Sequence, residues 1–149
     1  MGKKKVIEQS QIETQKGGSQ SAPTVHLAGA KKLKKIDQGR VYIKASYNNT
    51  LVSVTDQLGN LIAWVSAGSL GFGGPKKATP FAASKIIAAL AEELKNTGPT
   101  DIDVIMRGVG GGRDSALRSL INHGFNITSI RDVTPIPHNG PRPPKPRRV

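Results

Sequence analysis

Apolar and polar residues alternate in three short segments that follow residue 40, as they do in half-buried strands. The predicted strands are 41–46, 50–55 and 61–66. Residues 47–49 and 57–60 are suited to turns, because Asn and Gly tolerate left-handed backbone and the Asn side chain can bond its own backbone. Since short turns join antiparallel neighbours, these segments predict a three-stranded meander.

Helical spacing replaces the alternation after residue 79. Thr79 is a good N-cap, and Pro80 fits the first helical position. The helix is expected to run to about Lys95, before the break at residues 98–99. Its predicted core stripe is Ala83, Ile86, Ile87, Leu90 and Leu94.

The rest of the domain repeats strand and helix. Residues 101–107 and 126–133 predict strands, and residues 113–123 predict a helix that ends at Gly124 in the C′ position. In the first of these strands, Ile102, Val104 and Met106 are candidates for the buried face, but the neighbouring Ile105 leaves that face open. The predicted apolar face of the helix is Ala116, Leu117, Leu120 and Ile121.

The resulting order predicts the α/β class: a βββαβαβ mixed sheet with helices packed on it. This order resembles the ribonuclease-H-like arrangement. Such a nuclease needs clustered carboxylates for two Mg²⁺ ions, one of them in the middle of the first strand. Residues 41–46 contain no acid, so we expect the ribonuclease-H-like topology without its active site, and no enzyme.

The end of the chain, residues 134–149 (TPIPHNGPRPPKPRRV), predicts an extended arm. Proline fixes φ and lacks an N–H, which excludes helix and central strand. At ~3.1 Å per residue, the segment would span roughly 50 Å. It carries four cations and no acid, which suits a groove lined with phosphates. The alternative is a disordered tail that only confers solubility.

The beginning of the chain, residues 1–37, is rich in Lys, Gln, Ser and Gly and predicts a basic, disordered extension. Four lysines at 31, 32, 34 and 35 precede the first strand, either in a solvated linker or against phosphates. The predicted domains are therefore the extension 1–37, a single α/β domain 38–133 and the arm 134–149.

The net charge of +12 lies mostly in these two ends. Residues 1–39 contribute +5 and residues 133–149 contribute +4. This distribution favours a nucleic acid over a membrane, since no apolar run approaches ~20 residues. The chain has no cysteine, and its three histidines lack ligand spacing, so we expect neither a metal nor a cofactor.

Two glycine-rich segments, 67–79 and 108–112, precede the predicted helices. Neither matches the P-loop or the dinucleotide fingerprint. The free N–H groups of a helix N-terminus attract anions, and Lys76, Lys77, Arg107 and Arg113 flank these segments. A phosphate of an RNA backbone would fit, but the glycines would equally serve tight turns.

Four strings resemble the bacterial type of small-subunit ribosomal protein eleven: RVYIKASYNNTLVSVTD, LIAWVSAGSLGFGG, KKATPFAA and IRDVTPIPHNGPRPPKPRRV. The resemblance covers about residues 31–149, and the string over 131–142 is the most specific. The chain departs from the family at Pro141, where many bacterial members have Cys, and in its longer extension before Lys31. The segment 67–79 also differs in detail.

The resemblance implies a structural constituent of the small (30S) ribosomal subunit in the cytoplasm. It would bind 16S rRNA on the platform, near the mRNA exit and the Shine–Dalgarno cleft. Its expected neighbours are mRNA and ribosomal proteins seven, eighteen and twenty-one. The competing hypothesis is a free nucleic-acid-binding regulator, although no recognition-helix motif is visible.

The candidate rRNA-binding residues share a cationic or amide side chain in a loop, strand end or arm. They are Lys31, Lys32, Lys34, Lys35, Arg40, Asn48, Asn49, Lys76, Lys77, Arg107, Arg113, Arg131, His138, Asn139, Arg142, Lys145, Arg147 and Arg148.

The pair Asn139-Gly140 is a candidate for isoaspartate formation. Glycine leaves the following N–H open to attack the Asn side-chain amide, which yields a succinimide and then isoaspartate. The alternative is an unmodified Asn in a turn.

Overall fold

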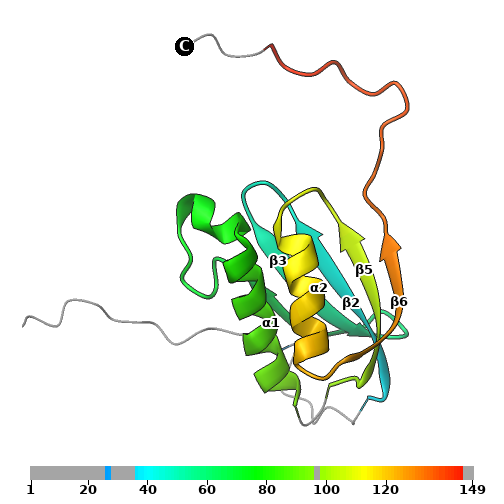
Figure 1. The fold of residues 1–149 in the computed structure, drawn as a ribbon. Coiled ribbons are helices and arrows are strands. Elements are labelled where there is room, and N and C mark those ends of the chain that lie inside the picture. The colour runs from blue at the N-terminus through cyan, green and yellow to red at the C-terminus, as the bar shows by residue number, and fades with distance from the viewer. Residues whose placement is uncertain (1–25, 28–35, 96–97, 146–149) are drawn as a thin grey trace, which may run out of the picture.

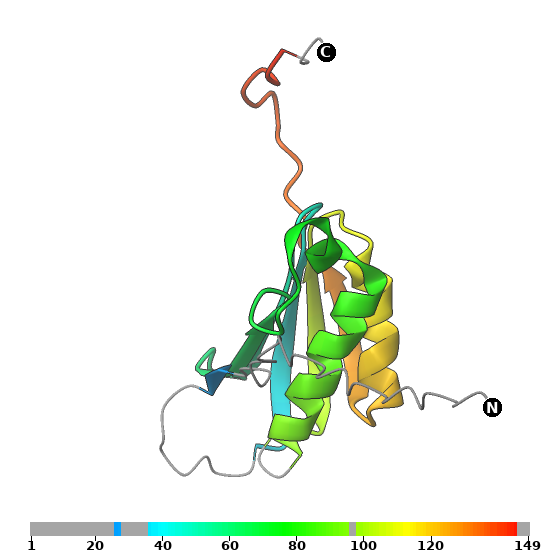
Figure 2. The same ribbon diagram turned by 90° about the vertical axis from the view of Figure 1, so that its left-hand side faces the viewer.

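The computed structural model describes residues 26–27, 36–95 and 98–145. Its elements are β1 (His26–Leu27), β2 (Gln38–Ala45), β3 (Thr50–Asp56), β4 (Leu61–Ser66), the 3-10 helix η1 (Gly74–Ala78), α1 (Pro80–Leu94), β5 (Asp101–Arg107), α2 (Gly112–Asn122) and β6 (Asn126–Asp132). The strands form one sheet in the order β1-β4-β3-β2-β5-β6. Both helices lie on the same face of the sheet (Figures 1 and 2).

The sheet is mixed, as predicted. Strands β2, β3 and β4 form the antiparallel meander, and β5 and β6 add parallel strands beside β2. Parallel neighbours need crossovers, which α1 and α2 provide. The predicted order of elements from β2 to β6 is therefore confirmed, with strand and helix ends shifted by three residues at most.

Two elements were not predicted. Strand β1 pairs with β4 through His26 opposite Trp64 and Leu27 opposite Ala63, which corrects the expectation that residues 1–37 lack regular structure. A two-residue strand shows no alternation that could be recognised in the sequence. The second element is η1, within the glycine-rich segment 67–79.

The core lies between the helices and the covered face of the sheet. Ile102, Val104 and Met106 are buried there, which settles the face of β5. The predicted stripe of α1 is buried along its whole length. One prediction for α2 is wrong, because Ile121 is 57 % exposed while Ser119 is buried.

The buried face of α2 does not coincide with the face that carries its large apolar residues, because three of the four buried residues are small. Its buried residues are Gly112, Ala116, Ser119 and Leu120. Helix α2 packs beside α1, and small side chains let the two helices approach closely.

The helix ends follow their sequence signals. The Thr79 side chain accepts a hydrogen bond from Ala82 N at 3.2 Å, as an N-cap does. Gly124 has φ +85°, and its N–H donates to Ile121 O at 3.0 Å while Phe125 N–H donates to Leu120 O at 3.2 Å. This pair of bonds is a Schellman motif, and it confirms Gly124 as C′.

Glycines let the loop between β5 and α2 lie directly against the turn between β2 and β3. A Cβ at Gly108 would lie 2.1 Å from Ala45 O, and one at Gly110 would lie 2.4 Å from Ser46 O. Gly108 also has φ +102°. These two glycines are therefore required by close backbone contact, whether or not the loop binds an anion.

We predict that Gly110→Ala destabilises the domain by roughly 1–3 kcal/mol, because its Cβ forces two backbone segments apart. Gly111→Ala is the matched control, since nothing lies within 4 Å of its ideal Cβ. That variant should change the free energy of unfolding by no more than about 1 kcal/mol. Urea denaturation measures both, and equal effects would contradict the close contact.

Candidate nucleic-acid interface

The strands β2, β5 and β6 all finish at one end of the sheet, and the loops that carry candidate residues meet there (Figure 1). We call this region the loop end: turn 46–49, segment 67–79, loop 108–111 and Thr134. Backbone hydrogen bonds hold it together, from Gly110 N to Ala45 O at 3.0 Å and from Ala67 N to Thr50 O at 3.0 Å. Residues far apart in the sequence thus share one surface.

Six of the predicted RNA contacts lie at or beside the loop end. They are Asn48, Asn49, Lys76, Lys77, Arg107 and Arg113. Asn48, Lys76 and Arg107 are exposed, and the other three are half-buried. The two lysines lie in η1, which presents them next to the N-terminus of α1.

A second set of cations lies on the face of the sheet away from the helices. Arg40 and Lys44 alternate along β2 with buried residues, so they point to that face. Lys44 is in register with Arg107 of β5, and Arg131 of β6 is in register with Ile105. Lys44 was missed as a candidate, although its place among the polar positions of a half-buried strand could have indicated it.

Five of the eight acidic residues in the described part of the chain gather toward the opposite end of the sheet. They are Asp37, Asp56, Glu92, Glu93 and Asp101. Lys95 also lies there. The charge of the described domain is therefore polarised along the strands, with the loop end as the better place for an anionic partner.

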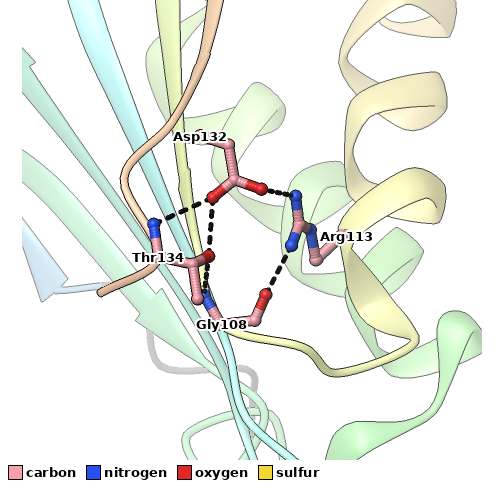
Figure 3. A network of polar contacts seen from close by, with 4 residues as sticks. All are labelled: Gly108, Arg113, Asp132 and Thr134. Carbon is pink, nitrogen blue, oxygen red and sulfur yellow. Dashed lines mark hydrogen bonds and ion pairs between the residues drawn. The ribbon is translucent and has the colours of Figure 1, made fainter. Parts of the chain in front are cut away.

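The root of the C-terminal arm is fixed by a polar network (Figure 3). One carboxylate oxygen of Asp132, Oδ1, accepts hydrogen bonds from Thr134 N at 2.9 Å and from Thr134 Oγ1 at 2.6 Å. Gly108 N donates to Thr134 Oγ1 at 3.0 Å. Arg113 forms an ion pair with Asp132 and donates to Gly108 O at 2.6 Å.

This network gives Arg113 partners inside the chain. Its guanidinium joins the start of α2 to the end of β6. Its phosphate contact stays a prediction. Asp132 and Thr134 were not recognised as site residues, although an Asp two residues before a Thr at a strand end is typical of an Asx turn.

Beyond Thr134 the described arm has no helix or strand, and residues 135–145 are exposed. It leads away from the domain in both views (Figures 1 and 2). His138, Asn139, Arg142 and Lys145 lie along it, and Asn139 has φ +52°. Six candidates lie outside the described residues: Lys31, Lys32, Lys34, Lys35, Arg147 and Arg148.

No group of three or more His, Asp or Glu side chains in the described residues is arranged to hold a metal ion. Within the same residues, no helix is long and apolar enough to cross a membrane.

Comparison with known proteins gives a consistent result. A family model described as Ribosomal protein S11 matches residues 39–148. The small ribosomal subunit protein uS11 of Chlorobaculum parvum is 51% identical over 119 residues, which cover 80% of this chain and 94% of that protein.

The network makes a prediction about pH. Hydrogen bonds from the Thr134 side chain and N–H, together with Arg113, lower the pKa of Asp132 from 3.8 to about 2. Because this pKa is depressed on folding, the stabilisation is complete above pH 3.8 and is lost as the pH falls toward 2. An NMR titration of the Asp132 carboxyl carbon should show a midpoint near 2.

Thr134→Val serves as the matched variant, because it removes the hydroxyl donor and keeps the shape. Its Asp132 midpoint should move up toward 3.8. A wild-type midpoint that already lies at 3.8 would contradict the network.

Proposed function

The chain belongs to the ribosomal protein S11 family, and on this premise we propose how it serves the small subunit. It is a structural constituent of that subunit in the cytoplasmic ribosome, with rRNA as its partner. We propose that it binds 16S rRNA on the platform, near the mRNA exit and the Shine–Dalgarno cleft.

One observation supports this proposal above the others: the loop end brings together cations and amides from segments that are far apart in the sequence. Such a surface contacts phosphates and ribose, which positions RNA without reading its bases. The open sheet face, with Arg40, Lys44 and Arg131, extends the same surface.

The domain division belongs to the proposal as well. Residues 38–133 form the rRNA-binding domain, and the basic segments 1–37 and 134–149 act as arms that follow RNA grooves. The exposed residues 135–145 support this role for the C-terminal arm. Ribosomal proteins seven, eighteen and twenty-one and the mRNA are the proposed neighbours.

We propose that the chain has the ribonuclease-H-like topology without nuclease activity. The central strand β2 carries no carboxylate. Asp103 of β5 accepts a hydrogen bond from Ser129 Oγ at 2.7 Å, and Asp132 is paired with Arg113. Asp103, in the strand beside β2, and Asp132, at the end of β6, therefore each have a structural partner.

Sedimentation distinguishes this function from that of a free regulator. In cell extracts at high Mg²⁺, the chain, identified by mass spectrometry of its peptides, should travel with the small subunit. Its presence only in the slowly sedimenting fraction would support the regulator instead.

The arm makes a quantitative prediction. If Arg142, Lys145, Arg147 and Arg148 each neutralise one phosphate, their replacement by Ala should flatten the plot of log K against log salt. At about 0.7–0.9 per phosphate, the slope should change by roughly 3. Filter binding of a 16S rRNA fragment at several salt concentrations measures it.

The control is a variant that keeps the positive charges and combines Arg142→Lys, Arg147→Lys and Arg148→Lys. Its plot of log K against log salt should retain the wild-type slope. Melting of the four-alanine variant should stay near that of the wild type, because the described arm is exposed. A four-alanine variant with the wild-type slope would show that the arm only confers solubility.

We also propose that Asn139 converts to isoaspartate. It is exposed in the arm, and Gly140 follows it. The backbone nitrogen of Gly140 attacks the side-chain amide carbon of Asn139 and expels ammonia, and water then opens the succinimide. The product has one more backbone atom and one negative charge beside His138. Peptide mapping of ribosome-derived protein should find a modified fraction that Asn139→Gln lacks, and only intact Asn139 in aged samples would reject the proposal.

A further inference from the structure

One ring of an aromatic pair beside the loop end lies outside the core. Phe81, in the first turn of α1, is 62 % exposed. Its ring meets Phe72 edge to face, with centroids 6.1 Å apart and an interplanar angle of 81°. Phe72 is half-buried and packs against the core, so it holds an exposed ring in place.

One lysine lies over the exposed ring of this pair, and two more lie near it along the chain. The Nζ atom of Lys85 lies 5.7 Å from the centroid of the Phe81 ring. Lys76 and Lys77 lie in η1, which joins Phe72 to the start of α1. An exposed ring has lysines on both sides along the chain. Proteins that bind single-stranded nucleic acids combine these two features: an aromatic ring on which a base stacks, and cations that contact the backbone.

The charged residues of α1 are placed unfavourably for its helix dipole. Acids favour a helix N-terminus and bases favour a C-terminus, yet α1 has no acid in its first turn and no base in its last turn. Glu92 and Glu93 lie near its C-terminus instead. This arrangement costs helix stability and makes the N-terminal end positive, which favours a ligand that carries phosphate.

A purely structural role explains Phe81 poorly. A hydrophobic staple would join the residue before the N-cap to the fourth helical residue, here Ala78 and Ala83. Phe81 occupies neither position. The two rings meet edge to face, and this contact leaves most of the Phe81 side chain in solvent.

We propose that Phe81 stacks on an unpaired base of single-stranded RNA, with Phe72 as its brace and Lys76, Lys77 and Lys85 on the adjacent phosphates. Unpaired bases in RNA loops and bulges stack on aromatic side chains in this way. The proposal rests on the rRNA-binding function above, and it adds a base contact to a surface otherwise suited to the backbone.

The first test compares substitutions at Phe81 in the full chain, with the 16S rRNA fragment as probe. Phe81→Ala and Phe81→Leu should each weaken binding roughly 5- to 150-fold, because stacking is lost. Phe81→Tyr should retain binding. The slope of log K against log salt should stay unchanged in all three, since no phosphate contact is removed.

Leu58→Ala is the matched control, because Leu58 is 89 % exposed in the turn after β3, at the opposite end of the sheet. It should bind like the wild type. Unchanged melting temperatures for the Phe81 variants separate lost stacking from lost folding.

The second test uses a single-stranded oligouridylate that contains one 5-iodouridine. Irradiation joins this base to an aromatic ring stacked on it. The crosslink should fall in the tryptic peptide 78–85, which contains Phe81, and should disappear in Phe81→Ala.

Two results would overturn the inference while the proposed function stands: wild-type rRNA affinity in Phe81→Ala, or crosslinks confined to other peptides. The first would point to a protein that covers the ring. A wild-type chain that fails to bind 16S rRNA would instead remove the function together with the inference.

Discussion

Direct contact between two backbone segments determines the shape of the functional end of this domain. The loop after β5 lies against the turn after β2, and there is no room for a side chain at Gly108 or Gly110. This contact brings Asn48 and Arg107 to one surface and sets where α2 begins. The geometry of the loop end thus depends more on the absence of Cβ atoms at Gly108 and Gly110 than on any charged group.

The same loop receives the arm. Gly108 donates to Thr134 and accepts from Arg113, so the strand that leads into the arm is tied to the helix that precedes it. One cation is used inside the molecule for this purpose. An ion pair that is partly exposed adds little stability, and its value here lies in the direction that it gives to the first residues of the arm.

Much of the fold could be predicted from the sequence, since local signals and tertiary structure agree. The Thr79–Pro80 helix start and strand β4 are found where the pattern places them. The predictions fail where tertiary contact decides. Ile121 is exposed because α2 turns its small residues inward, and β1 exists only through its pairing with β4.

For the candidate site, the sequence indicated which residues carry charge but not how the fold arranges them. Charge and composition identified cations in loops and arm, but not which of them would be paired within the chain. Arg113 and Asp132 are 19 residues apart, and no local sequence pattern predicts their contact. The exposure of Phe81 also depends on packing, because the sequence places an ordinary apolar residue at the start of a helix.

The separation of charge along the sheet has a consequence before any contact forms. A body with an excess of cations at one end and an excess of carboxylates at the other experiences a torque in the field of a polyanion. Within about one Debye length of RNA, roughly 8 Å at physiological ionic strength, the domain turns its loops toward the nucleic acid and its acidic end away. If the loop end binds RNA as proposed, diffusional encounters then begin in the orientation that leads to binding.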